Sequence, residues 1–267
     1  MDGNVDSNLN LGTGMDKCAF EKWAAFYVSD FSPKEIMDFS VVRIESESDA
    51  SSLFHASLDE TCNHSVEKAV CNVPIFAMRG FDTPRNLVSF IQRVKKEYSE
   101  KNLNLKFYLQ IDSGIPGGLS DETIASAFSL LGSGEFLGIS FRGNDFLQNP
   151  KKFNRYIYSV QRHGQSVKID FSLFDEMKTV DDKIIQKVVP NEIVGNSLFD
   201  ADFFLANKTF LCEHNITAIF TPDNFRKFGS EYLNRIRILR DSGVDVKVGS
   251  GNYLFHGIDL NDFAEAL

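Results

Sequence analysis

Short apolar runs alternate with amphipathic stretches along most of the chain. Runs of this length are typical of strands buried on both faces of a parallel sheet. Together with the opening stretch NVDSNLN (4–10), the pattern predicts eight strands. The other seven runs span residues 72–80, 105–112, 135–141, 166–171, 191–196, 216–221 and 244–250.

The stretches between these runs have the marks of helices. TPRNLVSFIQRVKKEYSE begins with Thr83, a good N-cap, and Pro84 suits the first helical position. SDETIASAFSLLG opens with Ser120 and carries acidic residues in its first turn. The stretches 149–164 and 229–243 end in glycine, a common helix terminator. Strand and helix thus alternate with a repeat of roughly 25–35 residues, which is typical of βαβ units.

Eight such units in 267 residues predict a single (β/α)8 TIM barrel domain over residues 1–267. A doubly wound open sheet is the alternative. Residues 15–65 do not fit the repeat, since they hold the helix-like AFEKWAAFYVSDF and the polar RIESESDASS. We therefore expect a helical insertion after the first strand, and a short closing helix over 258–267.

Composition narrows the class of protein. The hydrophobic fraction is 43%, with 25 Phe and one Trp, which predicts a Phe-rich core that also takes in Tyr156 and Tyr158. The net charge of −9 argues against a nucleic-acid or anionic-membrane surface. No apolar run approaches the length of a membrane span.

The four cysteines form no C-x-x-C pair, so they signal neither a structural zinc site nor a redox motif. The chain also lacks an N-terminal apolar segment typical of secretion. We therefore expect free thiols and a cytoplasmic location.

Candidate chemistry lies at the carboxyl ends of the strands, where barrel enzymes place their active sites. In VDSNLN, Asn8 and Asn10 alternate, so their side chains point the same way. The later strand ends add further polar or small residues: Arg79, Gln110, Asp112, Ser140, Arg142, Gly143, Asp145, Asp170, Asn196, Thr221, Ser250 and Gly251.

These strand ends lack the residues that hold metals or common cofactors. None of the five histidines falls directly at a strand end, and Asp170 alone is a poor site for a divalent ion. GIPGGLSD (114–121) is glycine-rich but does not match a phosphate-loop spacing. The residues therefore predict no metal and no cofactor.

Four strand-end segments, VDSNLN, NVPIFAMR, YLQIDS and GISFRGND, follow one another in the order of a known family's motifs. On these segments the chain resembles the adenosine and AMP deaminases, zinc-dependent purine deaminases built on a (β/α)8 barrel. The family opens with Val-Asp-x-His-x-His, whose histidines bind zinc. Here Val5 and Asp6 match, while Asn8 and Asn10 replace both histidines.

The next three strands keep parts of the family pattern. NVPIFAMR retains Asn72 and Arg79, and YLQIDS retains Gln110. GISFRGND retains Gly143, with Asp145 in place of the family's Glu. The similarity extends from Val5 to about His256. Over this length the strand-end motifs keep the order and spacing of the family, which makes the resemblance more specific than any single motif.

The family's catalytic motifs are replaced in the remaining strands. DFSL places Asp170 and Leu173 where the family has a zinc-binding His and the proton-handling Glu. GNS gives Asn196 for the His that positions water, and GSGN gives Ser250 and Gly251 for the last zinc ligand and a water-activating Asp.

Deamination of this type needs zinc to lower the pKa of bound water, with an acid and a base beside the purine. The resemblance therefore implies a catalytically inactive pseudoenzyme without zinc and without catalytic residues. It would bind a purine nucleoside or nucleotide such as AMP, or serve as an interaction or scaffold protein for a protein partner or larger assembly. The implied pocket comprises Asn8, Asn10, Arg79, Gln110, Gly143, Asp145, Asp170, Asn196, Ser250 and Gly251.

Other readings stay open. The chain could be a divergent but active purine deaminase, or an enzyme of metal-free chemistry with Asp170 and Asp112 as an acid–base pair. A purely structural reading has Asn8 and Asn10 bonding each other and buried water. In that reading Asp170 forms a salt bridge with Arg79 or Arg142.

Overall fold

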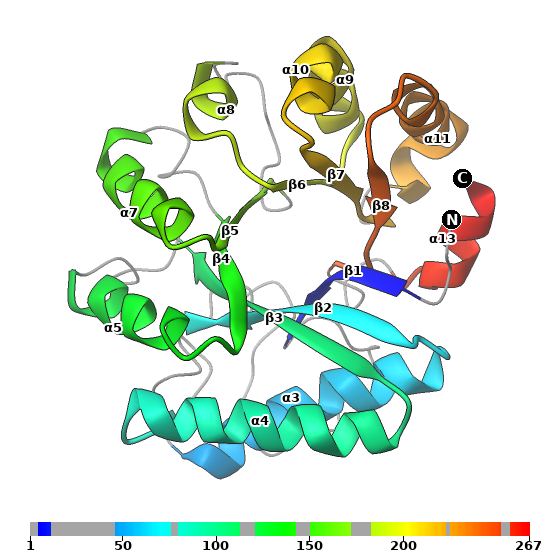
Figure 1. Cartoon of the computed structure of the whole chain (residues 1–267). Helices are drawn as coiled ribbons and strands as arrows, with labels where there is room; N and C mark the ends of the chain where they lie inside the picture. Colours follow the sequence, from blue (N-terminus) through cyan, green and yellow to red (C-terminus); the bar gives the residue numbers. More distant parts are fainter. Residues whose placement is uncertain are drawn as a thin grey trace.

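Eight parallel strands form one sheet in the order β1 to β8, as the computed structural model of the chain shows (Figure 1). The structure describes residues 5–11, 46–75, 80–112, 121–142, 150–171, 183–222, 225–251 and 257–267. The strands are β1 Val5–Asn10, β2 Lys68–Pro74, β3 Asn104–Asp112, β4 Phe136–Arg142, β5 Ser166–Asp170, β6 Glu192–Gly195, β7 Thr217–Phe220 and β8 Val246–Val248.

The sheet closes where the chain after β8 meets β1. Leu9 and Gly251 form a parallel bridge. The Gly251 N–H donates to the Asn8 carbonyl at 2.8 Å, and the Asn10 N–H donates to the Gly251 carbonyl at 3.4 Å. This closure and the sequential strand order confirm the (β/α)8 barrel and exclude the doubly wound open sheet.

The helices surround the strands on the outside (Figure 1). Thr83 caps α4 by accepting the Asn86 N–H, with Pro84 as the first helical residue, as the sequence predicts. No helix in the described ranges is long and apolar enough to cross a membrane. The helices are α3 Glu47–Asn63, α4 Pro84–Glu100, α5 Asp121–Leu131, α7 Pro150–Arg162, α8 Lys183–Val188, α9 Leu198–Ala206, α10 Lys208–Glu213, α11 Phe225–Asp241 and α13 Leu260–Ala266.

The segment between β1 and β2 contains α3, which begins inside the polar stretch RIESESDASS. Ser46 and Asp49 form a capping box: the Ser46 hydroxyl accepts the Asp49 N–H and the Asp49 carboxylate accepts the Ser46 N–H. These polar residues are therefore a helix start. The helix-like AFEKWAAFYVSDF lies outside the described residues.

The second strand begins earlier than the sequence pattern predicts. The pattern predicts a strand over 72–80, whereas β2 spans Lys68–Pro74. The strand begins with the exposed Lys68 and pairs residue by residue with β3 from Asn104 onward. A strand that begins with a polar residue is not marked at its start by an apolar run, so the pattern predicts its start too late.

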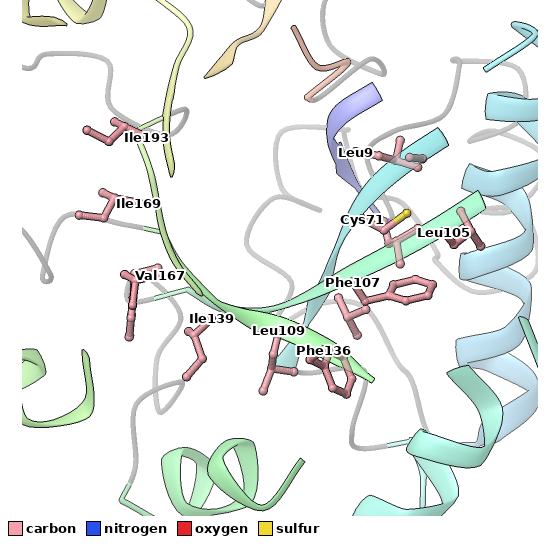
Figure 2. Packing of buried hydrophobic residues seen from close by; sticks show 14 of the residues in the cluster. Leu9, Cys71, Leu105, Phe107, Leu109, Phe136, Ile139, Val167, Ile169 and Ile193 are labelled. Carbon is pink, nitrogen blue, oxygen red and sulfur yellow. The ribbon is translucent and has the colours of Figure 1, made fainter. Parts of the chain in front are cut away.

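The core lies between the outer faces of the strands and the helices. Figure 2 shows Leu9, Cys71, Phe107, Ile139 and Ile169 on this outer side, and all five are buried. A series of ring contacts continues the core through Phe171, Phe204, Phe220 and Tyr232, as expected of a Phe-rich chain.

Tyr158 is not part of this core, contrary to the prediction. It is 66% exposed, while Tyr156 is half-buried and packs against the core. Both lie on α7, where residues two apart point to opposite sides, so they cannot share one face.

The inner face of the barrel is polar over much of the described sheet. Asn8, Asn72, Ser140, Lys168 and Asp170 all have 0% exposure. They alternate with the outward residues of their strands, as strand geometry requires. Tyr108, Val194 and Ile219 provide buried apolar area that is separate from the outer core.

Candidate functional site

The buried polar residues of the barrel interior form the candidate site. Of the predicted pocket, Asn8, Asn10, Gln110, Asp170, Asn196, Ser250 and Gly251 are described and buried. Arg79, Gly143 and Asp145 lie outside the described residues. We call this described part, which lies on the strands and at their carboxyl ends, the floor of the site.

Three asparagines from β1 and β2 form one hydrogen-bonded group, which we call the Asn cluster: Asn8, Asn10 and Asn72. The Asn72 Nδ2 donates to the Asn8 Oδ1 at 2.8 Å and to the Asn10 Oδ1 at 2.7 Å. Parallel pairing places Asn10 directly beside Asn72. The two β1 amides are thus joined through Asn72, whereas the structural reading had them bonded to each other.

Lys168 of β5 reaches across the barrel to the Asn cluster. Its ammonium lies 3.2 Å from the Asn8 Oδ1, 3.4 Å from the Asn72 Oδ1 and 3.5 Å from the Ser7 carbonyl. The strand-end pattern does not single it out. A signal was available, since Lys168 precedes Asp170 by two residues in a buried strand and so points the same way.

Two further groups compensate the buried charge of Lys168. The Glu192 Oε2 lies 3.5 Å from the ammonium, which also sits 4.3 Å from the centroid of the Tyr108 ring. Cation–π attraction is strongest where water is excluded, as it is here. Burial and the nearby Glu192 carboxylate raise the pKa of Tyr108, so its hydroxyl stays neutral.

Asp6 connects the chain after β8 to β1. The Ser250 hydroxyl donates to the Asp6 Oδ2 at 2.5 Å, and the Ser250 and Asn8 N–H groups both donate to the Oδ1 at 3.0 Å. Burial raises the pKa of Asp6 in spite of these donors. The strand register shifts between Asp6 and Leu9, so Asp6 pairs with the outward-facing Ala69. Ser250 and Asp6 therefore meet on the outer side of β1, where they line a small cavity with Glu60 of α3 and Leu260 of α13.

Asn196 belongs to a different structure at the start of α9. Its N–H donates to the Asp200 Oδ2 at 2.8 Å, and the Ser197 N–H donates to the same atom at 3.0 Å. Burial raises the pKa of Asp200 to about 6, with a smaller contribution from the Asp170 charge. The sequence did not single out Asp200, although S-x-x-D is a capping-box signature.

The remaining predicted residues line neighbouring strands. Gln110 pairs in register with Ser140, which pairs with Lys168. Arg142 pairs with Asp170, and both side chains are almost completely buried. The two residues are neighbours in adjacent strands, and a salt bridge between Asp170 and Arg142 stays a prediction.

The described residues do not fit a zinc ion. Zinc in proteins takes imidazole, thiolate or carboxylate ligands, whereas the Asn8 and Asn10 oxygens are neutral and already accept hydrogen bonds. A dication near Asn8 would also meet the Lys168 ammonium and be repelled. Within the described ranges no three His, Cys, Asp or Glu residues are grouped to hold a metal.

Comparison with known proteins finds a similarity of fold and none of sequence family. No family model matches the chain, and no curated protein matches it in sequence. Solved structures do match over 98% of the chain. A Burkholderia ambifaria amidohydrolase with bound zinc has a TM-score of 0.74 at 10% identity, with 78% of its own chain covered.

Two further matches are purine-related. The adenine deaminase of Arthrobacter aurescens has a TM-score of 0.69 at 13% identity, with 85% of its chain covered. Arabidopsis ADAL, in complex with IMP, has a TM-score of 0.65 at 12% identity, with 84% of its chain covered. The chain thus has the barrel fold of these amidohydrolases and deaminases.

Proposed function

We propose that this protein is a purine deaminase-like barrel that binds a purine nucleoside or nucleotide, such as AMP, without zinc-dependent catalysis. The observation that carries the proposal is the buried ammonium of Lys168, 3.2 Å from the amide oxygen of Asn8. It places a fixed positive charge at the strand end where the resemblance puts zinc-binding histidines.

Oxygen atoms surround the Lys168 nitrogen. Three oxygens, from Asn8, Asn72 and Ser7, face its nitrogen, and the Glu192 carboxylate compensates its charge. Such a site resists a dication, because the ammonium already occupies the place beside these oxygens. An active zinc deaminase would need all of these contacts rearranged.

Purines are the ligand class that the fold favours. One neighbour is an adenine deaminase, and another is solved with IMP. The barrel floor of this chain offers buried amide, hydroxyl and charged groups, which suit the ring edge of a purine. A protein partner and a cytoplasmic location remain predictions from the sequence.

The proposal is tested by measuring zinc content and binding on the same purified protein. We expect less than about 0.1 zinc per chain and no ammonia released from adenosine or AMP. We also expect a rise in Tm with a purine nucleoside or nucleotide, since a ligand that binds only the native state stabilises it. Uridine and UMP are the controls, because they keep the sugar and phosphate but lack the purine.

Two outcomes would overturn it. Stoichiometric zinc together with ammonia release would identify an active deaminase. No shift with any purine at millimolar concentration would leave the barrel without the proposed ligand and favour the scaffold hypothesis.

A further inference from the structure

The orientation of the Asn8 amide is fixed by its neighbours. Amide oxygen and nitrogen are usually hard to distinguish, and the hydrogen-bond network must decide. Lys168 can only donate, so the atom of Asn8 that faces it at 3.2 Å must be the oxygen. The same oxygen accepts from the Asn72 Nδ2 at 2.8 Å. The Asn8 NH2 group therefore points away from both residues.

That NH2 group is a buried donor without an acceptor in the described part of the chain. The Ser140 hydroxyl on β4, which is 0% exposed, is likewise without a partner there. Leaving a buried donor unpaired costs free energy, because the group has lost its hydrogen bonds to water. A ligand that brings an acceptor atom to either group would recover that cost.

No described acceptor forms a hydrogen bond with the Asn8 NH2 group. The Asn72 Nδ2 is already shared between Asn8 and Asn10, and its oxygen faces Lys168. Asp200 has an oxygen without a described partner, but it lies on α9 against Gly195, within the helix cap. The floor beside Asn8 thus presents a donor.

From this donor we infer that the site prefers a 6-oxopurine, such as inosine or its monophosphate, to the 6-aminopurine counterpart; the inference rests on the proposed function. A carbonyl oxygen at position 6 can accept two hydrogen bonds. An amino group at that position presents a donor to the Asn8 NH2 group and leaves it unpaired. The ribose and phosphate are strongly hydrated, which favours the ring edge as the part that enters the barrel.

Three nucleosides with the same ribose test the preference by calorimetry. Inosine carries the 6-oxo group, adenosine the 6-amino group, and purine riboside no group at position 6. We expect inosine to bind at least about tenfold more tightly than the other two, which corresponds to about 1.4 kcal/mol.

Asn8→Asp is the decisive variant, because it replaces the NH2 group by an acceptor of the same shape. The added negative charge lies beside the Lys168 ammonium, which can compensate it. We expect the preference to move from inosine to adenosine. Asn104→Asp makes the same chemical change at the exposed entry of β3, at the opposite end of the barrel, and should leave the ratio unchanged.

Ser140→Ala provides a second test should Asn8→Asp fail to fold, since it removes only one oxygen from a buried position. The Ser140→Ala variant should lower the binding affinity for inosine more than that for adenosine. The inference would be overturned if the native protein bound the three nucleosides with equal affinity. It would also be overturned if the ratio of inosine to adenosine affinity were unchanged in both site variants. Either result would leave the proposed purine binding intact. If no nucleoside binds, the proposed function itself fails.

Discussion

At the scale of single residues, Lys168 is the strongest departure from what the strand pattern suggests. A charged side chain at 0% exposure is tolerated only with compensating partners, and Lys168 has oxygens, a carboxylate and an aromatic ring around it. Removing it would take the cation away from Glu192 and one donor away from each of the Asn8 and Asn72 oxygens.

Lys168→Met should therefore lower the free energy of unfolding by about 3–5 kcal/mol, the usual cost of breaking a buried ion pair from one side. Urea unfolding followed by circular dichroism measures it. Lys106→Met on β3, at an exposed position, is the control and should change stability by less than about 0.5 kcal/mol. Equal stabilities for the two variants would contradict the assigned role of Lys168.

Asp200 makes stability depend on pH. Its pKa is about 6 in the folded protein against 3.8 as the ordinary value, so folding favours the protonated form. Between these values the unfolded chain binds fewer protons, so the free energy of unfolding falls as pH rises from about 4 to 6. The difference corresponds to roughly 3 kcal/mol. The raised pKa of Asp6 acts in the same direction.

Asp200→Asn should flatten this fall in stability between pH 4 and pH 6, because the amide does not ionise. Urea unfolding at several pH values shows the slope. Asp202→Asn on the same helix, with its side chain half exposed, should keep the native slope. A slope unaffected by Asp200→Asn would place the responsible group elsewhere.

At the scale of elements, the junction between β8 and β1 decides whether the barrel closes. Gly249 lies so close to β1 that an added Cβ would come within 2.6 Å of both the Asn8 nitrogen and its Cβ. Only glycine allows this approach, and the approach lets Gly251 bond to Asn8. The same contact holds Asn8 in place for the Asn cluster.

Gly249→Ala should accordingly destabilise the protein by about 1–3 kcal/mol, the usual cost of forcing extra volume into a packed site. It should also weaken purine binding, since Asn8 must move. Gly132→Ala is the matched control, because its nearest atom lies at an ordinary 3.6 Å. Thermal unfolding and calorimetry report the two effects. A Gly249→Ala protein as stable as the control would exclude a tight junction.

At the scale of the whole molecule, α13 covers the seam where the first and last strands meet. Leu260 of α13 lines a small cavity together with Asp6 and Ser250, and Figure 1 shows the helix beside β1. His64 at the end of α3 contacts Asp259, the N-cap of α13, which ties the two helices together. Phe263 anchors α13 against the ring of Tyr232.

Phe263→Ala should cost about 3–5 kcal/mol, as expected for truncating a fully buried aromatic residue. Its ring also packs edge-on against Phe225 of α11, so both neighbours lose contacts. Phe199→Ala removes the same side chain from a position that is 53% exposed, and should be nearly neutral. Comparable midpoints in urea for the two variants would argue against a role for α13 in closing the barrel.

Much of this architecture could be predicted from the sequence. The strands over 105–112, 135–141 and 166–171 were placed to within one residue, because buried parallel strands are continuous apolar runs. The start of α4 at Thr83 and Pro84 was likewise predicted from local chemistry. The apolar pattern fails where an element begins with polar residues. It predicts the start of β2 too late, and it predicts no start for α3.

The sequence by itself determined the repeated βα units, the strand-end position of the candidate residues and the alternation that turns Asn8 and Asn10 to one face, because these follow from local periodicity. Only the tertiary structure decided their partners. Asn72 and Lys168 are 64 and 160 residues from Asn8 along the chain, and only the closed sheet brings their side chains together. Contacts across a barrel depend on strand register and closure, which no local pattern specifies.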